Sequence, residues 1–152
     1  MRDIIFKGKR VDNGEWVYGY YFKATHHWHN HGIHKDWIAT DTVQNGGWCN
    51  VRGKYAVLPE TVGQYTGLTD KNGKKIWEGD IVIKIGKIQI DDKTFEDGIK
   101  EKGVVGFKFG CFALLDNYKD DKSGGTLFIA PKYESYEVIG NVFDNPELLE
   151  VK

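Results

Sequence analysis

The choice of aliphatic side chains is the feature that most restricts the fold of this chain. The sequence holds 25 valines and isoleucines against 12 alanines and leucines. Side chains that branch at Cβ pack well on a pleated sheet and lose rotamer freedom in a helix, whereas alanine and leucine favour helices. The 19 glycines, against 3 prolines, supply tight turns. The composition therefore predicts a mainly β protein.

Length and turn spacing predict how the strands are organised. A chain of 152 residues fits one ordinary domain. Asn13-Gly14 joins the apolar runs 4–11 and 15–22, which is a strong hairpin signal. In the second half, short runs alternate with glycine-bearing turns at a spacing typical of small barrels. We expect one domain over residues 1–152, with short strands in a small barrel (Src-homology-3-like or similar), an N-terminal hairpin extension and one short C-terminal helical turn.

The run at residues 81–90 contains a change of phase. Its apolar residues occupy positions 81, 83 and 85, and then positions 88 and 90. The buried face should therefore switch near Gly86-Lys87. A slip of one residue indicates either a β-bulge or a tight turn. We favour the bulge, because a turn would leave two strands of about five residues each.

Charge and cysteine content exclude several classes of protein. Lys+Arg is 21 and Asp+Glu is 22, so no extended basic tract is built to grip nucleic acid. The two cysteines, Cys49 and Cys111, cannot form a disulfide framework or a four-cysteine zinc site. The first ten residues mix charged and apolar side chains, unlike a signal peptide, and no later run is long enough to span a bilayer. We expect a cytoplasmic protein that has no membrane partner.

The histidines form the sharpest local cluster. All 5 lie within nine residues, at His26, His27, His29, His31 and His34. If the segment is extended, His27, His29 and His31 project from one face, and imidazoles at this spacing can share one transition metal. The alternative is a solvated loop, which we favour because no histidine elsewhere in the chain can complete a site. A metal-binding protein or metal-dependent enzyme that uses the cluster from His26 to His34 remains the competing hypothesis.

A row of aromatic residues has two interpretations. Trp16, Tyr18, Tyr20 and Phe22 share one face of a strand at period two. They could form a stacking platform for single-stranded nucleic acid or the inner face of a hairpin. We expect the inner face, and we keep a nucleic-acid-binding accessory protein as an alternative that would use the basic residues near the N-terminus. These basic residues are Arg2, Lys7, Lys9 and Arg10.

No set of residues forms a recognisable catalytic motif. Glu78 and Asp80 flank Gly79 and could be a carboxylate pair for acid–base chemistry. We favour a structural role, in which Gly79 adopts an unusual backbone angle at the start of a strand and both acids are exposed or accept local amides. The two serines, Ser123 and Ser135, lie in no nucleophile motif. We therefore expect no catalytic residue, no cofactor-binding residue and no cofactor.

Three segments carry a resemblance to a known family. They read IFKGKR with GEWVYG within residues 5–19, ETVGQYTGL through DKNGKKIWEGDIV within residues 60–82, and VIGNVFDNPELL at residues 138–149. In this order and spacing they resemble the YopX family of small phage and prophage proteins, over essentially the whole chain. The resemblance implies a β-rich fold and a phage or prophage origin. The family has no established activity whose residues could be carried over.

These observations favour a binding role over catalysis. We expect an uncharacterised phage or prophage protein that acts in the bacterial cytoplasm as a non-enzymatic interaction module. Its partner would be a host or phage macromolecule. A β-rich chain with unpaired sheet edges also invites strand addition, so we expect a homo-oligomer.

Overall fold

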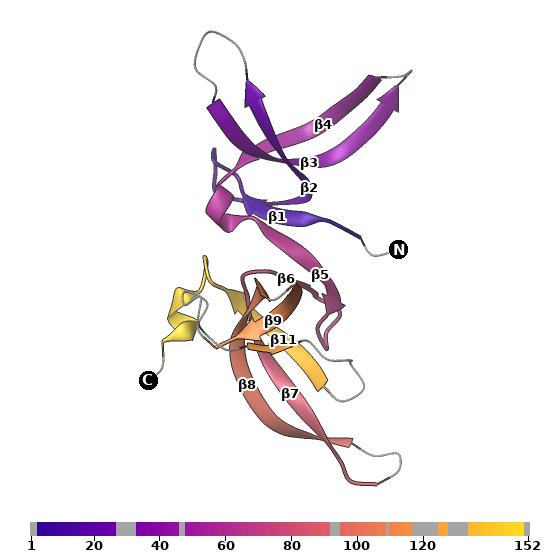
Figure 1. Ribbon diagram of the computed structural model, residues 1–152, viewed down its shortest axis with the longest axis vertical. Coiled ribbons are helices and arrows are strands. Elements are labelled where there is room, and N and C mark those ends of the chain that lie inside the picture. Colours follow the sequence, from indigo (N-terminus) through magenta and orange to yellow (C-terminus); the bar gives the residue numbers. More distant parts are fainter. Residues whose placement is uncertain are drawn as a thin grey trace. The chain divides into compact units, whose positions relative to one another are not determined.

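The computed structural model describes residues 3–26, 33–45, 48–91, 95–108, 110–116, 125–127 and 134–150. Strands dominate this part of the chain, and every pair of strands that it contains is antiparallel (Figure 1). The prediction of a mainly β protein is confirmed. The strands are β1 (Phe6–Lys9), β2 (Trp16–His26), β3 (Ile33–Asn45), β4 (Trp48–Val57), β5 (Gly63–Thr69), β6 (Lys75–Trp77), β7 (Asp80–Gln89), β8 (Phe95–Lys108), β9 (Cys111–Leu115), β10 (Gly125–Leu127) and β11 (Glu134–Asn141).

Two sheets and two compact units organise the chain. One sheet has the order β4-β3-β2-β1-β5-β6 and the other β10-β9-β8-β7-β11. The compact units are Met1–Tyr65 and Thr66–Lys152, so β5 begins in the first unit and ends in the second. The described strands include no closed barrel, and the Src-homology-3-like part of the prediction stays a prediction. The single domain over residues 1–152 also stays a prediction.

The first unit buries one face of its sheet. Gly14 turns the chain with a φ of +73° between β1 and β2, which confirms the predicted N-terminal hairpin. The central residues of the core are Val17, Ile38 and Val57, one from each of β2, β3 and β4. The partly buried residues packed against them are Phe6, Tyr21, Tyr55 and Val62. A 3₁₀ turn, η1 (Pro59–Thr61), then leads into β5.

The second unit is held together by apolar residues from five strands. Its core cluster is Ile76, Val82, Val105, Leu114 and Tyr136, with Leu68 and Val138 packed against it. The chain closes with η2 (Pro146–Leu149), which confirms the single C-terminal helical turn. Side chains of this turn pack closely against Gly140 of β11. A Cβ at Gly140 would lie 2.7 Å from Asn145 Oδ1 and 2.8 Å from Leu148 Cδ1.

A register shift lies where the change of phase predicted a bulge, but the extra residue is in the partner strand. Ile85 pairs with Lys100 and Lys87 pairs with Asp97, so two residues of β8 oppose Gly86 of β7. The register shift is confirmed, and the extra residue belongs to β8. Ile88 and Ile90 were expected on a new buried face, and this was wrong, because both are more than half exposed. At this point the β7–β8 hairpin extends beyond the residues that pair with β11 and β9.

Several strands are longer than the sequence predicted. β2 continues to His26, and β3 begins at Ile33 and has 13 residues. β8 begins at Phe95 and has 14 residues. The expectation of short strands was wrong for these hairpins. Polar composition marks where a strand leaves the core, but backbone pairing in a hairpin continues beyond that point.

Among the described residues, no helix has the length and apolar character that crossing a membrane requires.

Candidate functional site

The sheet of the first unit has two chemically different faces. Residues directly opposite each other in an antiparallel pair place their side chains on the same face. The pairs Gly8↔Val17 and Tyr21↔Ile38 therefore belong to the core face. The pairs Lys9↔Trp16, Lys7↔Tyr18, Tyr20↔Ala39 and Phe22↔Trp37 belong to the opposite face. We call the latter the aromatic–lysine face, and its members are Lys7, Lys9, Trp16, Tyr18, Tyr20, Phe22, Lys35, Trp37, Ala39 and Lys54.

The aromatic row of β2 faces outward at its centre. Tyr18 and Tyr20 are 51% and 56% exposed, whereas Val17 on the core face is 7% exposed. The expectation that the row forms the inner face of a hairpin was therefore wrong for these two tyrosines. Both faces of β2 carry large apolar side chains, so period two alone did not distinguish them. The other face is buried because Ile38 and Val57 of the neighbouring strands project from it.

Lysine side chains lie close to the aromatic rings of this face. The Nζ atoms of Lys7 and Lys9 lie 4.8 Å and 5.5 Å from the centre of the Trp16 ring, and Lys54 Nζ lies 5.5 Å from that of Trp37. Such cation–π contacts contribute about 0.5–1 kcal/mol at exposed sites. Lys7 is 5% exposed and thus covered, whereas Lys54 is exposed. The face therefore presents rings and cations together.

The acidic residue of these strands whose side chain the structure describes lies on the core face. Asp36 is the one acidic residue among the strand positions of the first unit whose side chains the structure describes. It pairs with Lys23 on the core face and accepts a hydrogen bond from the Tyr21 hydroxyl. Burial, together with the hydrogen bond to Asp36, raises the pKa of Tyr21 to about 12. The positions of the aromatic–lysine face whose side chains the structure describes therefore include four lysines and no acidic residue.

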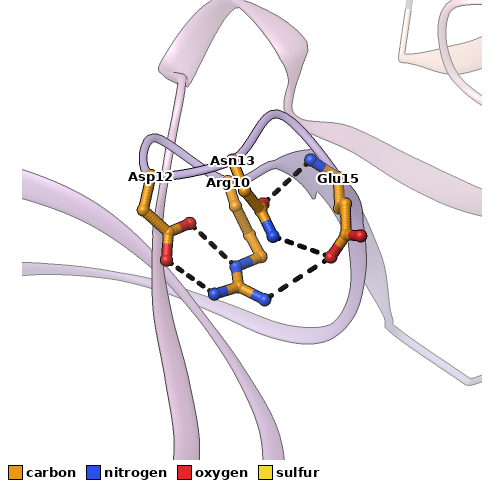
Figure 2. Close-up of polar contacts among 4 residues, drawn as sticks. All are labelled: Arg10, Asp12, Asn13 and Glu15. Carbon is orange, nitrogen blue, oxygen red and sulfur yellow. Dashed lines mark hydrogen bonds and ion pairs between the residues drawn. The ribbon is translucent and has the colours of Figure 1, made fainter.

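Arg10 is held within the β1–β2 turn (Figure 2). Its Nε and Nη2 atoms donate to the two Asp12 carboxylate oxygens at 2.9 Å and 2.6 Å, and its Nη1 lies 3.8 Å from Glu15 Oε2. Asn13 Nδ2 donates to the same Glu15 oxygen at 2.7 Å. The paired hydrogen bond with Arg10 lowers the pKa of Asp12. The guanidinium also stacks 4.3 Å from the Tyr55 ring, on the core face.

The basic residues near the N-terminus therefore do not act as one cluster. Arg10 is neutralised in its turn, and Lys7 is covered. Arg2 lies outside the described residues. The cations of the aromatic–lysine face come instead from three separate strands. Lys35 and Lys54 were not singled out from the sequence, because only the pairing of β3 and β4 with β2 brings them to this face.

The histidine site lies outside what the structure describes. His27, His29 and His31 fall between the described parts of β2 and β3, of which β2 ends at His26 and β3 contains His34. Within the described residues, no three or more His, Cys, Asp or Glu side chains are grouped so that they could hold a metal ion. The metal site of His27, His29 and His31 stays a prediction.

The Glu78-Gly79-Asp80 segment builds the start of β7. Gly79 has a φ of +83°, which confirms the unusual backbone angle predicted for it. Asp80 is buried, and its Oδ2 accepts the Trp77 N–H at 2.9 Å. The Gly79 N–H in turn donates to the Val105 carbonyl at 2.8 Å. Asp80 thus accepts a local amide, as the structural interpretation predicted.

Asp70 is a second buried carboxylate that accepts backbone N–H groups. Its Oδ1 accepts the N–H groups of Asn72 and Lys74 at 2.8 Å and 2.9 Å, and its Oδ2 accepts that of Val138 at 3.2 Å. Burial raises the pKa of Asp70, but these donors together lower it more, so that it lies below its ordinary value. The sequence signal for this role was an aspartate two residues before Asn72-Gly73, at the first position of the turn.

A third polar cluster joins β7 to β11. Lys84 Nζ lies 2.8 Å from Glu134 Oε1 and 3.7 Å from Glu101 Oε2. The Tyr136 hydroxyl donates to Glu134 Oε2 at 2.6 Å. Lys84 and Glu134 are both largely buried, so each satisfies the other's charge. We assign this cluster, like Asp70 and Asp80, to the stability of the second unit.

Comparisons with known proteins identify the family. The model of the YopX family, described as YopX protein, matches residues 6–150. The crystal structure of protein EF1440 from Enterococcus faecalis is 21% identical, with 99% of this chain and 100% of that chain covered and a TM-score of 0.47. A search of curated proteins gives no match. The family match spans both compact units and nearly all of the sequence. This chain belongs to the YopX family.

Proposed function

We propose that this protein is a non-enzymatic interaction module that binds a macromolecule through the aromatic–lysine face. The exposure of Tyr18 and Tyr20 carries the proposal. The sheet already forms its core with the opposite face, so these rings contribute nothing to that core. Tyrosine is enriched in binding interfaces because its ring is apolar and its hydroxyl makes hydrogen bonds.

The two rings have enough free surface to support binding. A tyrosine that is fully covered buries about 150–250 Å², so two half-exposed rings together offer about 150–250 Å² to a partner. At about 25 cal/mol per Å² this area corresponds to about 4–6 kcal/mol before the entropic cost of association. The rings stand on a strand that β1 and β3 pair on either side. Little backbone ordering therefore opposes binding.

The wider setting of this proposal is a phage or prophage protein that acts in the cytoplasm of a bacterial host. Its partner would be a host or phage macromolecule. Membership of the YopX family supports this setting, and the sequence resemblance implied the same origin.

A capture experiment with matched variants tests the proposal. Wild-type protein and Tyr18→Ala/Tyr20→Ala are immobilised and exposed to lysate of phage-infected bacteria. Phe107→Ala is the control, because Phe107 is an exposed aromatic residue of the second unit. We expect wild type and the control to capture the same partner and the double variant to lose it. Capture by all three proteins alike, or by none, would contradict the proposal.

A further inference from the structure

We infer that the partner bound by the aromatic–lysine face is a single-stranded nucleic acid, with bases on Tyr18 and Tyr20 and phosphates at the lysines. The inference rests on the proposed function and names the class of partner. Proteins that bind single strands combine aromatic side chains, on which bases stack, with cations along the backbone path. Sheets that present aromatic residues from their strands bind two or three unstacked bases in this way.

The spacing of the rings suits successive bases. Tyr18 and Tyr20 are two residues apart on β2 and project from the same face. A strand rises about 3.4 Å per residue, so their Cα atoms are about 6.8 Å apart. A nucleotide strand advances about 3.4 Å per stacked base and further when unstacked. A single strand that follows β2 can therefore place a base over each ring.

The lysines surround the rings on the same face. Lys9 pairs with Trp16 at the start of the row, and Lys35 pairs with Ala24 at its other end. Lys54 lies in register with Tyr20 across Ala39, two strands or about 10 Å away. Among the positions of this face whose side chains the structure describes, four are lysines and none is a carboxylate.

Charge and ring access together favour a single strand over other partners. The bases of a duplex are stacked on one another and cannot stack on the tyrosines without unpairing. An acidic peptide would pair with the lysines, but a nucleotide strand carries a flat base on every unit and so can cover both rings whatever its sequence. About three lysines in contact with phosphates predict a slope near −2 for the logarithm of affinity against the logarithm of salt concentration.

The test measures fluorescence anisotropy with labelled twelve-nucleotide strands of oligothymidylate and oligouridylate, and with a duplex of the same length. We expect both single strands to bind wild type with a salt slope near −2. Tyr18→Ala and Tyr20→Ala should each weaken binding by about 5-fold to 150-fold. Lys54→Gln should reduce the slope by about 0.7. Lys23→Gln, on the core face of β2, and Phe107→Ala are controls that should bind like wild type.

The outcomes separate this inference from the proposed function. Tighter binding of a single strand than of the duplex supports the inference. Comparing the affinities of oligothymidylate and oligouridylate then shows whether DNA or RNA supplies the bases. The inference is overturned if the duplex binds as tightly as the single strands, or if the tyrosine substitutions leave the affinity unchanged. If neither single strand binds wild type but nuclease-treated lysate still yields tyrosine-dependent capture, the inference is overturned and the interaction module stands. If both assays are negative, both proposals are overturned.

Discussion

Replacing Asp70 with asparagine tests whether one buried carboxylate joins a turn to the last strand of the second unit. The carboxylate accepts N–H groups from Asn72, Lys74 and Val138. An amide keeps one acceptor oxygen, but its NH₂ group must face at least one of these donors. Losing a hydrogen bond to a charged group costs about 1.5–3 kcal/mol, and a buried donor left unpaired costs about 1–3 kcal/mol. These costs overlap, so we expect Asp70→Asn to lower the free energy of unfolding by about 2–4 kcal/mol.

Thermal unfolding and hydrogen exchange measure this loss in complementary ways. For a chain of this length, 1 kcal/mol corresponds to about 2–4 °C in Tm, so Asp70→Asn should lower Tm by about 4–16 °C. Amide hydrogen exchange localises the effect, because the N–H groups of Asn72, Lys74 and Val138 lose their acceptor. We expect their exchange to accelerate, while the amides of Val17 and Ile38 in the first unit keep their protection.

The effect of Asp70→Asn depends on pH with a definite sign. The folded protein holds the pKa of Asp70 below its ordinary value of 3.8. A depressed folded pKa gives stability that is complete above the unfolded pKa and is lost as pH falls through the folded pKa. The difference in unfolding free energy between wild type and variant should therefore be constant near neutral pH and shrink below about pH 4.

Asp12→Asn is the matched control for this substitution. Asp12 is an exposed carboxylate that pairs with Arg10 in a surface turn. Surface ion pairs add little to stability because solvent screens them, so the control should keep a Tm close to that of wild type. An Asp70→Asn protein with the Tm of the control and unchanged exchange at Val138 would refute the role assigned to the carboxylate.

Two further substitutions test the turn before β7 and the exposed hairpin. Gly79→Ala should cost more stability than Gly73→Ala in thermal unfolding. Both glycines have φ near +80°, which costs about 1–2 kcal/mol for alanine. The two sites differ because only a Cβ at Gly79 would meet Phe143, at 3.3 Å. Equal Tm values would remove the packing argument. Ile88→Thr/Ile90→Thr should change stability by less than about 0.5 kcal/mol, because both side chains are exposed. The same variant should convert a homo-oligomer to monomer in sedimentation analysis, because it removes exposed apolar surface. An oligomer that persists in this variant would show that the hairpin does not mediate self-association.

Local chemistry was sufficient for several parts of the fold. The β-branched composition predicted the strands, and Asn13-Gly14 predicted a turn, because these preferences act within a few residues. The change of phase near Gly86 predicted the position of a register shift, although the extra residue lies in β8, which the pattern of β7 alone does not reveal. The unusual backbone angle at Gly79 also followed from its place before a strand.

Which face of the sheet is buried, and which residues lie on its exposed face, depended on the tertiary structure. The period of two in β2 places Tyr18 and Val17 on opposite faces, but burial depends on which face meets Ile38 and Val57 from strands far along the chain. Lys54 reaches the aromatic face only because β4 pairs with β3 in one register. Alternation along a strand is a local property, whereas register and burial arise from contacts between strands, and a single strand contains no information on its neighbours.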